Sequence, residues 1–129
     1  MQLFVDTFTN FHTPAVGLAG ARVIERIGPR TALAPNVCCG RPLISQGLLA
    51  EARALAAQNT ERLHAAAERG QPLVFFEPSC LSAIREDAPD LLRGEARASF
   101  VMDHGRFGPP GVLFSNYILR GLFHKFVIR

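Results

Sequence analysis

The chain has 129 residues, of which 48% are hydrophobic and 19% charged, and this balance fits one folded domain with a modest core. The net charge of +3 does not indicate nucleic-acid binding, because residues 1–103 carry 10 arginines against 11 acids and the positive excess lies in residues 104–129. No apolar run is long enough to span a membrane, so we expect a cytoplasmic protein whose only membrane contact would be peripheral, at the inner face.

Short apolar runs predict strands over residues 2–6, 30–34 and 72–76. The third run, Pro-Leu-Val-Phe-Phe, is apolar at almost every position, which is typical of a strand covered on both faces. We therefore predict that residues 72–76 form the central strand of the sheet.

Helices are predicted between these strands. Thr13 and Pro14 are typical of a helix start, and Gly28 is typical of a helix end. Regularly spaced apolar residues predict a long helix over 48–69, and a shorter one follows over about 80–87.

This order, β-α-β-α-β-α, predicts an α/β fold. Strands that alternate with helices form a parallel sheet covered on both faces, so we expect a three-layer sandwich with a short parallel sheet. The loops that follow the strands leave a parallel sheet at the same edge, where ligands usually bind.

The three cysteines of the chain lie in these loops, Cys38 and Cys39 after the second strand and Cys80 after the third. We therefore expect all three thiols to meet at one edge of the sheet. A helix starting near Cys80 would stabilise its thiolate, and Gly40 allows a tight turn beside the pair. Thiolates around a glycine turn suit an iron–sulfur cluster, zinc or a redox dithiol, whereas buried cysteines can also be plain packing residues.

Three segments carry a resemblance to a known family. They are Phe-Val-Asp-Thr-Phe-Thr-Asn at 4–10, Cys-Cys-Gly-Arg-Pro-Leu-Ile-Ser at 38–45 and Glu-Pro-Ser-Cys-Leu-Ser at 77–82. In order and spacing they resemble the cysteine-rich CCG domain found in heterodisulfide reductase and in the iron–sulfur subunit of glycolate oxidase. The resemblance is greatest to the C-terminal part of FAD-linked oxidases with iron–sulfur domains, which are similar to D-lactate or 2-hydroxyglutarate dehydrogenases.

The resemblance implies that residues 1–93 are one half-unit of a CCG domain that transfers electrons. Cys38, Cys39 and Cys80 would bind an iron–sulfur cluster, 4Fe–4S in type, with Gly40 at the cofactor. FAD would be bound only by a partner, either an oxidase domain or a subunit. Further partners would be a ferredoxin-type iron–sulfur domain and a second CCG half-unit. The implied activity is oxidation of a 2-hydroxy acid such as D-lactate or glycolate.

The ligand set of this chain departs from the family pattern. Thr7 stands where the family has its leading cysteine, and Ala83 stands at the last cysteine of Cys-x-x-Cys. The set is therefore incomplete in this chain. No glycine-rich nucleotide fingerprint follows a strand, so we expect the flavin and substrate sites to lie elsewhere and identify no catalytic residue here.

Three nearby residues have alternative roles. Glu77 either serves as an acid or base beside Cys80 or binds a backbone N–H, and the second role is favoured. Ser79 is predicted to cap the short helix. Arg41 either holds an anionic group near the thiolates or pairs with Asp6.

Residues 94–129 are expected to be a divergent tail, truncated or poorly ordered, since their composition changes abruptly. Two functions of different classes follow from the sequence. The first is the electron-transfer module. The alternative is a non-redox interaction module whose cysteines only pack in the core.

Overall fold

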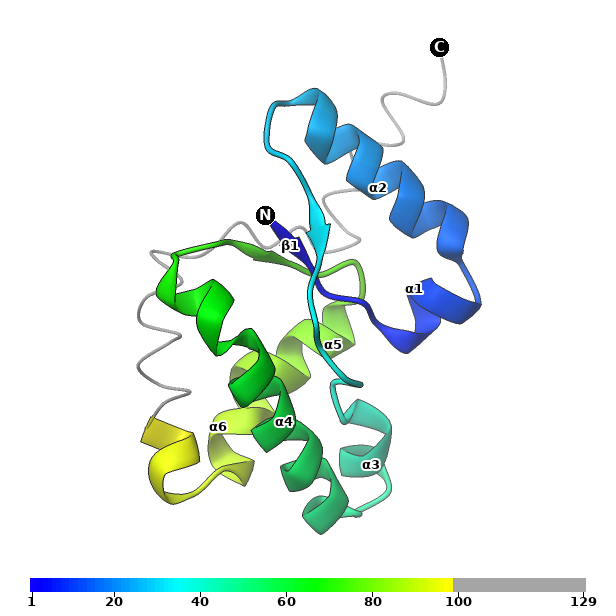
Figure 1. Cartoon of the computed structure of the whole chain (residues 1–129). Coiled ribbons are helices and arrows are strands. Elements are labelled where there is room, and N and C mark those ends of the chain that lie inside the picture. The colour runs from blue at the N-terminus through cyan, green and yellow to red at the C-terminus, as the bar shows by residue number, and fades with distance from the viewer. Residues whose placement is uncertain (99–129) are drawn as a thin grey trace.

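The computed structural model describes residues 1–98, and they form a mixed α/β domain, which confirms the predicted fold class (Figure 1). Three short parallel strands, β1 (Gln2–Leu3), β2 (Ala32–Leu33) and β3 (Leu73–Val74), form one sheet in the order β2-β1-β3. Leu3 pairs with Leu33 on one side and with Val74 on the other. The loops after all three strands therefore leave the sheet at one edge, as the sequence predicts.

The prediction that residues 72–76 form the central strand is wrong, because β1 is central and β3 lies at an edge of this sheet. An apolar run shows that both faces of a strand are covered, and β3 meets that condition at the edge. Val74 and Phe76 pack on one face, while Phe75 packs on the other. The apolar run therefore indicates that the strand is buried between two helical layers, and it does not indicate where the strand lies within the sheet.

The helices lie on both sides of the sheet. In Figure 1, α1 and α2 lie on one side of the strands and α3 to α6 on the other. The helices that end within the described residues are α1 (Thr7–Phe11), α2 (Pro14–Arg26), α3 (Arg41–Ser45), α4 (Leu49–Glu68), α5 (Pro78–Ser82), a π-helical turn (Ala83–Asp87) and α6 (Ala88–Leu91).

The predicted helices are present with small shifts of their ends. Gly28, with φ of 123°, follows the end of α2, and α4 begins one residue after the predicted start and ends one residue before the predicted end. Two helices were missed, α1 and α3, because each is a single short turn inside a segment predicted to be loop.

Two apolar clusters fill the spaces between the layers. On the face of α2, the cluster consists of Leu3, Ile24, Val74 and Phe76. On the other face a larger cluster joins the residues that follow the strands to α4 and α5, with Phe4 stacked on Phe75 at a centroid distance of 4.6 Å. Both sides of the sheet therefore carry a core, which is what a three-layer arrangement requires.

The predicted tail lies mostly outside the described residues. Of residues 94–129, only 94–98 are described, and Ala96 packs against the larger cluster. Among residues 1–98, no helix combines the length and the apolarity that crossing a membrane requires.

Candidate functional site

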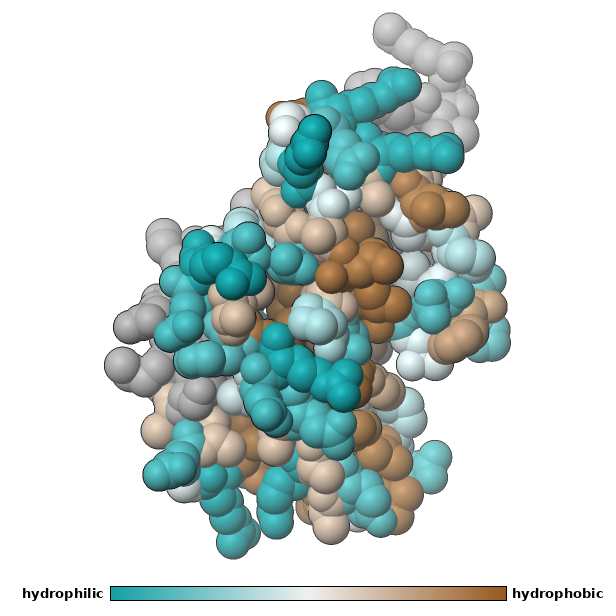
Figure 2. All heavy atoms as spheres, viewed as in Figure 1, coloured by the Kyte–Doolittle hydropathy of each residue, from teal (hydrophilic) through white to brown (hydrophobic). Residues whose placement is uncertain are grey.

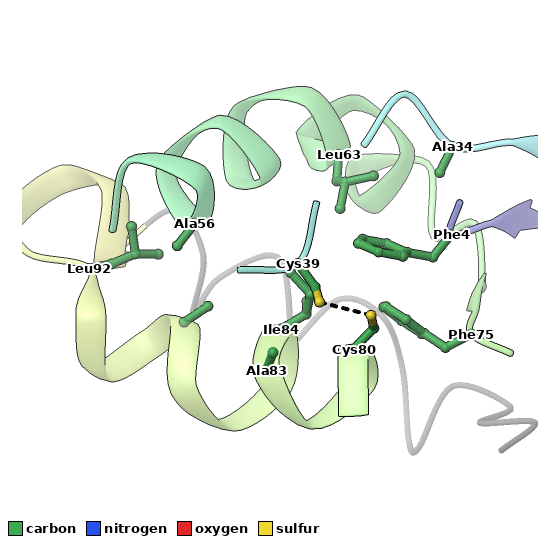
Figure 3. Packing of buried hydrophobic residues seen from close by; sticks show 11 residues of the cluster. Phe4, Ala34, Cys39, Ala56, Leu63, Phe75, Cys80, Ala83, Ile84 and Leu92 are labelled. Atoms are coloured by element: carbon green, nitrogen blue, oxygen red, sulfur yellow. Dashed lines mark hydrogen bonds between the residues drawn. The ribbon is translucent and has the colours of Figure 1, made fainter. Parts of the chain in front are cut away.

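The sulfur atoms of Cys39 and Cys80 lie 2.8 Å apart at the edge of the sheet where the strands end (Figure 3). Figure 3 shows the two side chains pointing toward one another from separate segments, beside the rings of Phe4 and Phe75. Both cysteines are buried, with exposed fractions of 6% and 7%, and both belong to the larger apolar cluster. The structure thus brings together two predicted thiols that lie 41 residues apart in the chain, and the thiol of Cys38 lies beside that of Cys39.

Two asparagines hold the segment that leads to this pair. Buried Asn59 of α4 accepts a hydrogen bond from the backbone N–H of Val37 and donates one to the carbonyl oxygen of Cys38. Asn36 accepts from the N–H of Val5 and donates to its carbonyl oxygen, so this segment is tied to the residues after β1. Neither asparagine was predicted to have a role. The sequence feature that could have revealed the role of Asn59 is its position, as a polar residue, on the apolar face of the long helix.

Gly40 turns the chain between Cys39 and α3. Its φ of +84° lies in the left-handed region, where a side chain is strained, so a glycine is favoured here. A methyl group at this position would meet Ala52 only at ordinary contact distance. The turn itself therefore explains Gly40, and its predicted contact with a cofactor remains a prediction.

Arg41 anchors the other side of the turn. Its guanidinium forms an ion pair with Asp87 and donates a hydrogen bond to Ser82 at 2.9 Å. The alternative pairing with Asp6 is not what the structure shows. Asp87 closes the π-helical turn, and the wider turn of a π-helix is common at functional positions. This ion pair joins the start of α3 to the helical segment that carries Cys80.

The start of α5 is capped by Glu77, as the favoured role predicted. Its carboxylate accepts hydrogen bonds from the backbone N–H of Ser79 at 3.1 Å and from the Ser79 hydroxyl at 2.8 Å. Ser79 is therefore a donor to the cap, and the prediction that it is itself the cap is wrong. Asp6 caps α1 in the same way, through the N–H of Thr9.

The two buried thiols differ in acidity. The pKa of Cys39 is lowered to about 7, first by the hydrogen bond with Cys80, then by the backbone N–H and charge of Arg41 and by the thiol of Cys38, against the opposing effect of burial. The pKa of Cys80 is raised, first by the same hydrogen bond, then by burial and by the charges of Cys39 and nearby carboxylates. When the pair loses one proton, the thiolate is therefore Cys39.

This result corrects the expectation that Cys80 would be the stabilised thiolate. Cys80 is the third residue of α5, whose first turn is already occupied by the Glu77 carboxylate. Cys39 instead lies just before α3 and receives the N–H of Arg41. The lowered pKa of Cys39 is thus due first to its hydrogen bond with Cys80 and then to the N–H of Arg41, and not to a helix start at Cys80.

The pair as it lies does not fit a metal ion held by this part of the chain alone. Two sulfur ligands of one tetrahedral zinc, each at about 2.3 Å, are separated by roughly 3.8 Å, which exceeds the 2.8 Å between Cys39 and Cys80. Within residues 1–98, no three His, Cys, Asp or Glu side chains are arranged to hold a metal ion. Binding of a cluster by Cys38, Cys39 and Cys80 stays a prediction that requires ligands from outside these residues.

The positions of the missing family cysteines agree with an incomplete set. Thr7 is exposed as the first residue of α1, and Ala83 is buried at 1% in the larger cluster. Cys38 is half-buried, and its carbonyl oxygen is held by Asn59. The described thiols are thus a buried pair with a third, more accessible thiol beside it.

Known proteins similar to the chain are dehydrogenases, or parts of them, by name. Over 94 residues the chain is 31% identical to one subunit of the anaerobic glycerol-3-phosphate dehydrogenase of Escherichia coli K12 and to the same subunit of Escherichia coli O157:H7. Over 86 residues it is 36% identical to the D-2-hydroxyglutarate dehydrogenase of Pseudomonas putida. No protein-family model and no solved structure matches the chain.

These similarities cover most of this chain but little of the relatives. The first alignments span 71% of the chain and 24% of each relative, and the third spans 66% of the chain and 8% of the relative. The chain therefore corresponds to about a quarter of the length of the first relatives. The similarity to a 2-hydroxy-acid dehydrogenase agrees with the resemblance of the sequence to FAD-linked oxidases, while the CCG domain in particular stays a prediction.

Proposed function

We propose that this chain is an electron-transfer module of a larger FAD-linked iron–sulfur oxidoreductase that oxidises 2-hydroxy acids such as D-lactate or glycolate. The observation that carries the proposal is the contact of two cysteine sulfurs at the strand-end edge of the sheet. The names of the similar proteins support a redox role, and D-2-hydroxyglutarate is itself a 2-hydroxy acid.

In this proposal the chain supplies the thiols and their surroundings, and the flavin belongs to a partner domain or subunit. Electrons would pass near Cys38, Cys39 and Cys80, between that flavin or a ferredoxin-type domain and an acceptor. An iron–sulfur cluster at these thiols would give a one-electron carrier once a partner, such as a second CCG half-unit, completed its ligands. We propose a cytoplasmic location, with membrane contact at most peripheral.

Residues of this chain would prepare the thiols for that role. Asn59 fixes the backbone at Cys38, and the N–H of Arg41 stabilises negative charge on Cys39. Burial excludes most water from the pair, which strengthens these interactions. Together these residues hold the sulfur pair in an apolar setting.

The test is anaerobic reconstitution of the full chain with iron and sulfide, with iron and zinc counted per chain and visible absorbance recorded. We expect iron with a cluster spectrum in the wild type when the partner domain is supplied, and loss of both in Cys39→Ser. Gln58→Ser, at an exposed position of α4, is the matched control and should retain both. Absence of iron in every sample, even with the partner, would contradict the cluster.

A second function is favoured by one specific observation. Cys39 and Cys80 are members of the apolar core, and large apolar residues are exposed at the surface, among them Leu33 of β2 at 71%. Figure 2 shows hydrophobic side chains gathered on the face between α2 and α4. A non-redox module that joins parts of an enzyme would have thiols that neither bind metal nor change oxidation state.

A further inference from the structure

The contact between Cys39 and Cys80 is closer to a covalent bond than to a shared metal ligand pair. A disulfide has a sulfur–sulfur length near 2.05 Å, so the 2.8 Å separation would have to shorten by about 0.8 Å. Figure 3 shows the side chains already directed at one another. Only a small movement separates the two thiols from a bond.

We infer that Cys39 and Cys80 form a reversible disulfide, which makes the metal-free chain a two-electron thiol carrier. The inference deepens the proposed redox function and rests on it for its biological purpose, while its chemistry requires only the two sulfurs. Formation of the bond removes one proton and one electron from each thiol.

The oxidant belongs to the class of small disulfides, R–S–S–R. The Cys39 sulfur attacks one sulfur of the oxidant, the R–S–S–R bond breaks, and the first thiol, RSH, leaves with a proton. The Cys80 sulfur then attacks Cys39 in the mixed disulfide, and the second RSH leaves with the remaining proton. Two electrons pass from the protein sulfurs to the oxidant, which is reduced to two thiols, and a dithiol reductant reverses both steps.

Cys38 is not suited to this bond. Adjacent Cα atoms across a trans peptide are about 3.8 Å apart, below the usual range of about 4.4–6.8 Å for a disulfide. The carbonyl of Cys38 is also held by Asn59, which resists the distortion that a bond to Cys39 would need. Cys38 is thus an internal control, since its loss should leave the pair intact.

The surroundings of the pair favour a disulfide between Cys39 and Cys80. The two cysteines come from segments fixed by different contacts, Cys39 before the left-handed Gly40 and Cys80 inside α5. The ion pair of Arg41 with Asp87 joins these segments directly. The fold therefore holds the sulfurs together in the reduced state, and closure of the bond requires no rearrangement of helices.

To test the inference, the full chain is oxidised with glutathione disulfide in the presence of a metal chelator. Its tryptic peptides are then mapped. Trypsin separates the sulfurs into peptides 31–53, which contains both Cys38 and Cys39, and 70–85, which contains Cys80. We expect these two peptides linked, with a loss of about 2 Da from the intact chain and recovery on addition of dithiothreitol. The same link should form in Cys38→Ser and be absent in Cys39→Ser and Cys80→Ser.

Three results would overturn the inference: three free thiols after oxidation, glutathione adducts without a link between the peptides, or loss of the link in Cys38→Ser. The peptide map of the wild-type chain remains a valid test even if a variant fails to fold. Circular dichroism identifies such a variant. A failed link together with iron in the reconstituted protein would remove the disulfide and leave the electron-transfer proposal. If the peptides are linked and no iron binds, the electrons would be carried by the thiols of Cys39 and Cys80 alone.

Discussion

At the scale of single residues, the thiol edge depends on side chains that carry no redox chemistry. Asn59 bonds one backbone N–H and one backbone carbonyl of the segment before Cys39. Each of these backbone groups would otherwise require another partner, since an unpaired buried polar group is costly. The position of Cys39 is thus a consequence of a residue twenty positions further along the chain.

We predict that Asn59→Ala lowers the free energy of unfolding by about 2–3 kcal/mol, because two backbone groups lose their partners. Urea denaturation of the reduced protein measures this loss. Gln58→Ala is the control, since Gln58 is the exposed neighbour on the same helix and should change stability by less than about 0.5 kcal/mol. Equal losses in the two variants would contradict the role of Asn59.

The acidity of Cys39 predicts a pH dependence of stability. Its pKa falls from an ordinary value of 9.0 to about 7 on folding, so the stabilisation is complete above pH 9 and is lost as the pH falls through 7. The raised pKa of Cys80 acts in the opposite direction, and only above pH 9. Between pH 7 and 9 the free energy of unfolding should therefore rise with pH, by about 1–2 kcal/mol.

Denaturation of the reduced, chelator-treated protein at pH 6, 7, 8 and 9 measures that rise. The control is Cys39→Ser, which has no thiol to ionise at this position and should show a flatter profile over the same range. If the two proteins gave parallel profiles, the lowered pKa of Cys39 would not be the cause.

At the scale of elements, the approach of α2 to the sheet is set by a glycine. A methyl group added to Gly20 would lie 2.3 Å from the ring of Phe76, so the helix backbone rests almost directly on this aromatic side chain. Gly20 and Phe76 are both buried, and Phe76 belongs to the cluster under α2. A larger residue would have to move the helix or the ring.

Gly20→Ala should therefore destabilise the protein by about 1–2 kcal/mol, although alanine is the better helix former by about 1 kcal/mol. Gly17→Ala is the comparison, since its methyl group would meet only the end of the Thr9 side chain, which can move. We expect Gly17→Ala to cost less in thermal denaturation. A stabilised Gly20→Ala variant would show that α2 is not in close contact with Phe76.

At the scale of the whole molecule, the larger cluster joins distant parts of the described chain, from Phe4 to Leu92, with Ala96 packed against it. Leu92 is 2% exposed in this cluster. We therefore predict that Leu92→Ala lowers the free energy of unfolding by about 2–5 kcal/mol in a denaturant titration. An unchanged free energy of unfolding would show that Leu92 does not contribute to the core.

Much of this arrangement follows from the sequence, because periodicity and parallel topology suffice to place the loops. The alternation of strands with helices predicted the layers, and the shared edge predicted that Cys39 and Cys80 would meet. The short helices α1 and α3 were not predictable in this way. Each is one turn long, and its formation depends on a single cap or a left-handed glycine.

Other features depend on contacts between distant residues and leave no local pattern. Arg41 and Asp87 are 46 positions apart, and the partner of the arginine could not be chosen from sequence. The identity of the thiolate likewise required the surroundings of both sulfurs, since a helix start near Cys80 favoured the wrong one. Strand order could not be deduced either, because an edge strand between two helical layers is as apolar as a central one.

The sequence separation of Cys39 and Cys80 has a consequence for the unfolded chain. A bond between these two cysteines, which are 41 positions apart, would close a loop that contains α3, α4 and β3, and such a loop reduces the conformations open to the denatured state. By the chain-entropy relation the oxidised form should be about 4 kcal/mol more resistant to unfolding than the reduced form. Oxidation by two electrons would then raise the free energy of unfolding. The denaturation midpoint would therefore distinguish the disulfide form of Cys39 and Cys80 from the dithiol form.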